Sequence, residues 1–122
     1  MGFEHEASTG RSPDEGPGLG SLLYGANALR IDVDDVLLQA LEVVSFTKMR
    51  RREPFLLSWQ DGTDETSGRR TIVIGPSVEL QFTYLSARVL EVRRDLIETL
   101  TQAANSNFGI RLDAVARTVA RS

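Results

Sequence analysis

One stretch of the sequence decides the fold class: residues Val78–Tyr84, which read VELQFTY. Apolar Val, Leu, Phe and Tyr alternate in it with Glu, Gln and Thr. This period of two predicts a β-strand with one buried and one solvated face, which is typical of an antiparallel sheet. The same alternation recurs in Phe55–Gln60, and the β-branched run Thr71–Ile74 predicts a further strand between them.

The residues before these strands predict a hairpin followed by a helix. Leu22–Tyr24 and Ala28–Ile31 flank the turn residues Gly25–Asn27, which is the pattern of a β-hairpin. A helix is predicted over Asp34–Arg51, because its apolar residues recur at helical spacing and Asp34 is a good helix cap. The apolar face of this helix comprises Leu37, Leu41 and Val44.

A second helix is predicted over Val92–Ser106 and a last short strand over Ile110–Leu112. The resulting order, β-β-α-β-β-β-α-β, predicts an α+β fold in which one antiparallel sheet has two helices packed on one face. The predicted core consists of Phe55, Leu57, Trp59, Ile72, Ile74, Leu80 and Phe82 from the strands, and Leu37, Leu41, Val44, Leu96 and Leu100 from the helices.

The chain of 122 residues divides into one domain and two flanking segments. Residues 1–19 are rich in Gly and Pro and hold little that could be buried, so we expect a disordered N-terminal extension. Residues 20–113 form the single predicted α+β domain. Residues 114–122 are expected to be a flexible C-terminal tail, in which Val115 and Val119 could support a weak helix.

Composition excludes several classes of protein. No apolar run is long enough to cross a bilayer, and the acidic start of the chain does not resemble a secretory signal, so we expect no membrane partner and a cytoplasmic location. The sequence has no cysteine, and its one histidine, His5, lies in the predicted disordered segment. Thiol catalysis, a His-based triad and a zinc site are therefore not expected, and we predict no cofactor and no catalytic residue.

Acidic residues gather at two places without the spacing of a known ion site. Asp32, Asp34 and Asp35 stand at the start of the first helix, where capping explains them better than a paired-acid or Mg²⁺ site. The polar segment Asp61–Gly68 reads as a hairpin loop; it lacks the distal Glu of a calcium loop.

Basic residues form the one local cluster in the sequence that could indicate a binding site. The excess of acidic residues lies in residues 1–20, so residues 21–122 are formally neutral and any binding of nucleic acid must depend on a local patch. Convergent arginines could grip phosphates, or the cations could simply complement the negative end of a helix dipole. The candidate nucleic-acid-binding residues are Lys48, Arg50, Arg51, Arg52, Arg69 and Arg70.

Six short stretches of the sequence are distinctive in their order: Gly20–Gly25, Thr47–Arg51, Phe55–Trp59, Gly68-Arg69, Thr71-Ile72 and Gln102–Ser106. Together they resemble a family of small actinobacterial proteins, of the Microbacteriaceae type, whose function is unknown. The resemblance covers residues 19–113, and members of the family often carry the label "ATP-dependent DNA ligase".

The resemblance implies a connection with DNA, but the residues do not carry ligase chemistry. DNA ligases attach AMP to the lysine of a Lys-x-Asp-Gly motif, whereas Lys48 is followed by Met49, Arg50 and Arg51. Family members begin with Met-Gly at the position of Leu19-Gly20. We therefore expect residues 1–18 to be an upstream extension from a start codon assigned too early.

The sequence thus leaves three functions open. The favoured one is a non-enzymatic interaction domain, with a homodimer through a sheet edge or a helix face as one arrangement. A nucleic-acid-binding accessory protein that uses the basic cluster is the alternative. A ligase-related activity is disfavoured, because the lysine motif is missing.

Overall fold

The structure, a computed structural model, describes residues 19–60, 68–88 and 91–121, and side chains up to residue 116. Residues 1–18 of the predicted disordered extension 1–19, and most of the predicted 61–68 loop, lie outside this range. The described residues form β1 (Leu19–Tyr24), β2 (Leu29–Asp34), α2 (Asp35–Arg50), β3 (Phe55–Gln60), β4 (Arg69–Ile74), β5 (Leu80–Thr83), α3 (Arg94–Ala104), β6 (Ile110–Arg111) and α4 (Leu112–Arg121).

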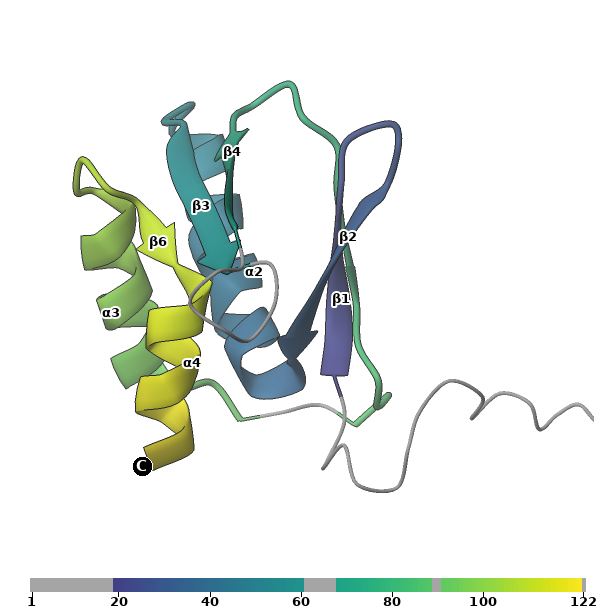
Figure 1. Cartoon of the computed structure of the whole chain (residues 1–122), viewed down its shortest axis with the longest axis vertical. Helices are drawn as coiled ribbons and strands as arrows, with labels where there is room; N and C mark the ends of the chain where they lie inside the picture. The colour runs from purple at the N-terminus through teal and green to yellow at the C-terminus, as the bar shows by residue number, and fades with distance from the viewer. Residues whose placement is uncertain (1–18, 61–67, 89–90, 122) are drawn as a thin grey trace, which may run out of the picture.

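The α+β class is confirmed, with strands and helices interleaved along the chain (Figure 1). The expectation of one antiparallel sheet is corrected, because the strands divide into two sheets of three. One has the order β2-β1-β5 and is called the β1 sheet; the other has the order β4-β3-β6 and is called the β3 sheet. All pairs are antiparallel except β3 with β6, which is parallel.

Each sheet is built around one central strand that is paired on both edges, β1 in one sheet and β3 in the other. β1 pairs with β2 through the predicted hairpin and with β5 across a long separation in sequence, so Leu22 lies beside both Ile31 and Phe82. β3 pairs with its hairpin partner β4 and with β6, which arrives after α3 and can therefore run parallel to it.

Helix α2 lies behind the sheets, and α3 and α4 lie on the side of β6 (Figure 1). The carboxylate of Asp34 accepts a hydrogen bond of 3.0 Å from the main-chain N–H of Val36, which confirms the predicted helix cap. α2 contacts β1 and β2 and packs along α3. None of the helices in the described part of the chain is both long and apolar enough to cross a bilayer.

The hydrophobic core contains the predicted face of α2 and much of the predicted strand set. The predicted residues that are buried are Leu37, Leu41, Val44, Phe55, Leu57, Ile74, Leu96 and Leu100. Trp59, Ile72, Leu80 and Phe82 are only partly buried and pack against this core. Trp59 lines the space between the two sheets and α4, whereas Leu80 and Phe82 line a groove beside α2.

Both predicted boundaries of the domain shift outward. Leu19 is the first residue of β1 and pairs with Asp34. At the other end, α4 begins at Leu112, and both Leu112 and Val115 are buried. The folded part therefore extends past residue 113, because this helix buries an apolar face that was expected to belong to a flexible tail.

Candidate functional site

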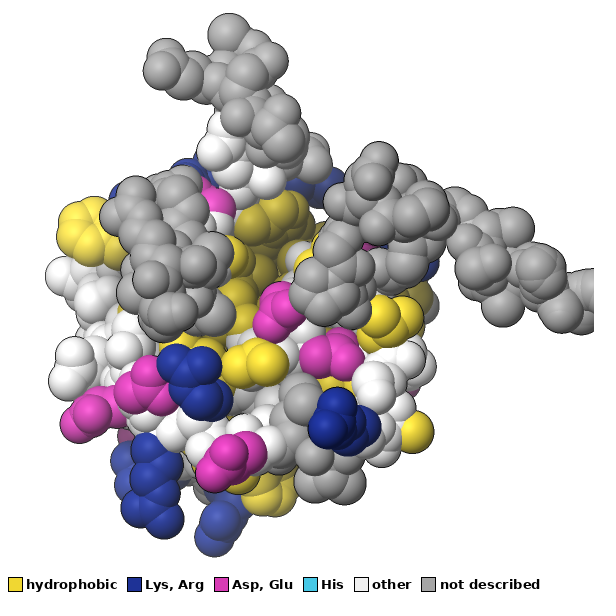
Figure 2. Space-filling view, turned by 90° about the horizontal axis from the view of Figure 1, so that it is seen from below, with side chains coloured by type: hydrophobic (Ala, Val, Ile, Leu, Met, Phe, Trp, Pro, Cys, Tyr) yellow, Lys and Arg dark blue, Asp and Glu magenta, His cyan; other side chains and the backbone are white. Residues whose placement is uncertain are grey.

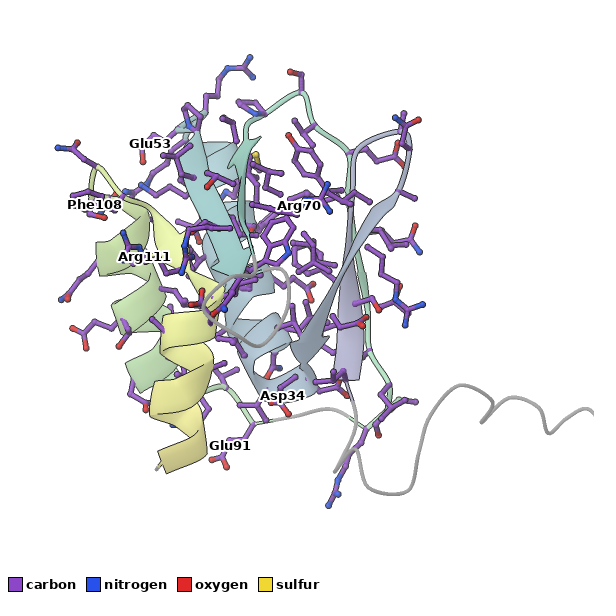
Figure 3. The ribbon with its side chains drawn as sticks, viewed as in Figure 1. Asp34, Glu53, Arg70, Glu91, Phe108 and Arg111 are labelled. Carbon is purple, nitrogen blue, oxygen red and sulfur yellow. The ribbon has the colours of Figure 1, made fainter. Side chains whose placement is uncertain are left out.

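The six basic residues predicted to form one patch lie at two ends of the molecule. Lys48 and Arg50–Arg52 stand at the end of α2, next to the start of β3. Arg69 and Arg70 pair with Gln60 and Trp59 at the other end of β3, which is roughly 15 Å away along the strand. Figure 3 shows Arg70 between the two sheets and Glu53 at the opposite end of β3. The structure therefore does not bring the six residues together.

Lys48 is buried and serves the packing of two helices. Its side chain is only 10% exposed, and its Nζ donates a hydrogen bond of 3.0 Å to Glu53. It also donates to the side-chain oxygen of Asn105, which follows α3. Lys48 thus ties the end of α2 to the end of α3 and does not point into solvent.

Arg69 and Arg70 are each engaged by a neighbouring side chain. Arg69 forms a two-pronged ion pair with Asp113, at 3.1 and 3.0 Å, and donates to the hydroxyl of Ser58 at 3.2 Å. The hydrogen bonds with Asp113 raise the pKa of Arg69. The guanidinium of Arg70 lies 6.0 Å from the centre of the Trp59 ring, within the range of a cation–π contact.

Arg50, Arg51 and Arg52 remain exposed at the end of α2. The guanidinium of Arg50 lies 5.8 Å from the centre of the Phe46 ring. Thr47, Arg50 and Arg51 line a shallow hollow of about 220 Å³. These three arginines are the part of the predicted patch that faces solvent together.

The outward side of α2 exposes hydrophobic side chains. Phe46 is 63% exposed and Val43 is 37% exposed, although the helix buries its opposite side in the core. We call the exposed side the α2 face and define it by Glu42, Val43, Phe46, Thr47 and Arg50.

A groove of about 290 Å³ adjoins the α2 face. It lies between α2 and the segment that ends in β5, and its walls are mainly apolar. The groove is lined by Glu42, Ser45, Phe46, Met49, Val78, Leu80 and Phe82. Phe46 therefore forms both a protruding ring and one wall of the adjacent groove.

Two residues that line this groove, Ser45 and Glu42, carry polar side chains. The hydroxyl of Ser45 is buried and has no hydrogen-bond partner among the described residues, which is an uncommon and costly state for a polar atom. The hydroxyl of Tyr84 donates to the carboxylate of Glu42. Burial of the hydroxyl is the main cause that raises the pKa of Tyr84, and the hydrogen bond to Glu42 raises it further. Glu42 is thereby held beside the groove.

A second cavity, of about 410 Å³, lies between the two sheets and α4. Figure 2 shows a hollow with hydrophobic side chains at its floor and acidic ones beside it. Ile31, Val33, Trp59 and Leu112 contribute to its apolar lining, and its charged lining consists of Arg30, Asp32, Asp34 and Asp113.

The aspartates that line this cavity or lie next to it have structural partners. Asp32 pairs with Arg30 at 2.9 Å, Asp34 caps α2 and Asp113 holds Arg69. Asp35 accepts main-chain hydrogen bonds from Leu85 and from residue 86. Among the described residues, no group of three or more His, Cys, Asp or Glu side chains could hold a metal ion.

Sequence reasoning missed the α2 face, and part of it was detectable. Val43 and Phe46 fall outside the 37–41–44 spacing that defines the buried side of the helix, so two large apolar residues were left on the solvated side. Lys48 falls four residues after Val44 and so belongs to the buried side. The unpartnered hydroxyl of Ser45 has no signature in the sequence.

The fold and these surfaces define a small α+β domain with an exposed hydrophobic helix face. Residues 19–115 match the model of a family described as a domain of unknown function, DUF7882, and the chain belongs to this family. No curated protein and no solved structure matches the chain.

Proposed function

We propose that the chain is a non-enzymatic interaction domain that contacts another protein through the α2 face. The observation that carries the proposal is the position of Phe46, whose ring is 63% exposed next to an apolar groove. Exposed apolar side chains are common singly, but an aromatic side chain that adjoins an apolar groove is typical of a contact site. Burying a Phe side chain contributes about 1.5–3 kcal/mol, so a partner that covers this ring gains measurable affinity.

Other exposed hydrophobic residues support a contact site less well. Phe108 is 71% exposed, and Arg111 lies 5.6 Å from the centre of its ring (Figure 3), much as Arg50 lies near Phe46. Unlike Phe46, Phe108 lines none of the three cavities described above. Val73 is exposed on β4 without an aromatic neighbour in the same strand. Of these exposed residues, only those of the α2 face combine an exposed ring, a second exposed apolar side chain and a groove.

The non-enzymatic part of the proposal is supported by what the charged groups do. Lys48 is held between Glu53 and Asn105, in a position that suits helix packing better than nucleotide attachment. Asp34 and Asp35 hold main-chain N–H groups. Groups engaged in the scaffold in this way are poorly placed for proton transfer or nucleophilic attack. The cytoplasmic location stays a prediction.

Site-specific photo-crosslinking in the native cells tests this proposal. A benzophenone amino acid at position 46 is expected to form a discrete protein adduct on irradiation. The matched control carries the same group at Val73, which is 53% exposed on another element, and is expected to form far less adduct. Equal labelling at both positions, or no adduct at position 46, would contradict the proposed contact surface.

Nucleic-acid binding is a second candidate, now limited to Arg50, Arg51 and Arg52. The observation that favours it is that these three consecutive arginines are exposed together at the end of α2. Phosphate contacts weaken as salt rises, so a gel-shift assay at two salt concentrations tests it. Salt-sensitive binding that is lost on changing Arg51 and Arg52 to Ser would support this candidate, and no shift at low salt would remove it.

A further inference from the structure

We propose that the partner of the α2 face is a second copy of this chain, bound with its α2 antiparallel to the first about a two-fold axis near Phe46. This inference rests on the proposed function, because it names the partner of the same surface. It commits the contact to a symmetric homodimer in which the same face is used on both copies.

The charges on the α2 face are complementary to themselves when the helix is reversed. Glu42, Phe46 and Arg50 stand four residues apart on one side of α2, and all three are exposed. Glu42 and Arg50 therefore lie about 6 Å before and after Phe46 along the helix axis. When two copies pack antiparallel with Phe46 at the centre, Glu42 of each copy lies opposite Arg50 of the other.

This arrangement forms two equivalent ion pairs around a hydrophobic centre. A parallel pairing would instead place Glu42 beside Glu42 and Arg50 beside Arg50, which is repulsive. The charge order along the helix therefore favours the antiparallel dimer and selects against the parallel one. A carboxylate has acceptor capacity for more than one donor, so Glu42 can pair with an arginine and keep the hydrogen bond from Tyr84.

The centre of the contact is hydrophobic and has room for a second ring. Val43 is partly exposed beside Phe46 on one side, and the apolar groove adjoins Phe46 on the other. Aromatic rings prefer offset packing, and the groove provides space for the ring of the second copy to lie offset from the first. The groove wall also includes the buried hydroxyl of Ser45, which lacks a hydrogen-bond partner among the described residues.

The size of the face sets the expected strength of the dimer. A face built on one helix of 16 residues is about 24 Å long, and it offers less than the roughly 800 Å² per partner of a standard stable interface. We therefore expect a dimer that dissociates on dilution, with a Kd on the order of 10–100 μM.

Charge reversal followed by mixing tests the inference in solution. Glu42→Arg sets two guanidinium groups opposite one another across the interface, and Arg50→Glu sets two carboxylates opposite one another. Each variant alone is expected to self-associate about tenfold more weakly than wild type in sedimentation velocity. An equimolar mixture of the two variants restores opposite charges across the interface, so it is expected to associate more strongly than either variant alone.

The controls separate folding from association. Glu98→Arg reverses an exposed charge on α3 and should leave association unchanged. If either reversal alters the thermal melt, Phe46→Ser replaces an exposed ring outside the core and should remove the dimer without unfolding the domain. A wild-type chain that stays monomeric at about 200 μM, or a mixture no stronger than its separate components, overturns the homodimer.

The photo-crosslink at position 46 distinguishes this inference from the proposed function. An adduct with the mass of two copies supports both. An adduct with a different protein upholds the proposed function and overturns the homodimer. The absence of any adduct, both in the cells and with the purified chain at about 200 μM, overturns both.

Discussion

The phenolic hydroxyl of Tyr24 on β1 donates a hydrogen bond of 2.7 Å to the main-chain carbonyl of Val73 on β4. These residues belong to the two different sheets, which are not joined by a strand pair among the described residues. A side chain therefore makes a polar link where a continuous sheet would have a main-chain ladder. The link holds the edge of β4 next to the β1 sheet. Elsewhere the two sheets are separated by the cavity of about 410 Å³.

Removing this hydroxyl should weaken the junction of the sheets without leaving a hole. Tyr24→Phe keeps the ring and deletes only the donor, so we expect a loss of about 1 kcal/mol in the free energy of unfolding. Urea denaturation followed by circular dichroism measures this change. An unchanged denaturation midpoint would show that the link contributes nothing.

Lys48 should matter more to stability than the arginines that follow it. Lys48→Ala leaves Glu53 and Asn105 without their shared donor at the junction of α2 and α3, so we expect a loss of about 2 kcal/mol. Arg51→Ala is the matched control, because Arg51 is exposed, and its effect should stay within about 0.5 kcal/mol. Equal effects of the two substitutions in denaturant titrations would contradict the structural role of Lys48.

Two glycines with the same backbone conformation should respond differently to alanine. Gly109 and Gly25 both have positive φ, at +74° and +77°. A Cβ at residue 109 would lie 2.3 Å from the carbonyl oxygen of Leu56, whereas a Cβ at residue 25 would have no atom within 4 Å. Gly25→Ala should cost about 1 kcal/mol from backbone strain alone, and Gly109→Ala about 2–3 kcal/mol. Thermal melts of the two variants measure the loss of stability in each. Similar losses would contradict the close approach of Gly109 to Leu56 on β3.

The start of α3 should respond to acid. Hydrogen bonds from Arg93, at 2.9 and 2.7 Å, hold the pKa of Asp95 at about 2, below its ordinary value near 3.9. A lowered pKa in the folded state means that the pair stabilises the fold above about pH 4 and loses this contribution as the pH falls towards 2. NMR titration of the Asp95 carboxyl should show the low pKa in wild type and a higher one in Arg93→Gln. The same pKa in both proteins would contradict the pairing.

Much of the fold could be predicted from local patterns, but the division of the strands could not. The cap at Asp34, the buried face of α2 and the strand Phe55–Gln60 each depend on neighbouring residues, and the structure contains all three. The predicted alternation in that strand holds for Phe55 and Leu57 but not beyond them, because Ser58 is buried and Trp59 is only partly buried. The pairing of β1 with β5 joins residues about 60 positions apart, such as Leu22 and Phe82. Local periodicity carries no information about such a pairing, so it cannot distinguish one sheet from two.

The candidate site was predictable only in part for a similar reason. Clusters of like charge are visible in a sequence, but their partners are not, because Asp113 and Asn105 reach Arg69 and Lys48 from distant elements. The exposed Phe46 follows from helical spacing once the buried face is fixed. The groove beside it needs Leu80 and Phe82 from β5, whose position relative to α2 depends on the tertiary fold.

In the proposed homodimer, the α2 face of each chain is covered by the α2 face of a second copy. Sedimentation equilibrium of the native chain over a dilution series, compared with Phe46→Ser, tests it most directly. We expect the mass of the native chain to approach that of two chains at high concentration and to fall to that of one chain on dilution, while Phe46→Ser stays at one chain throughout. A two-chain mass that survives Phe46→Ser, or a single-chain mass for both proteins at every concentration, would contradict it.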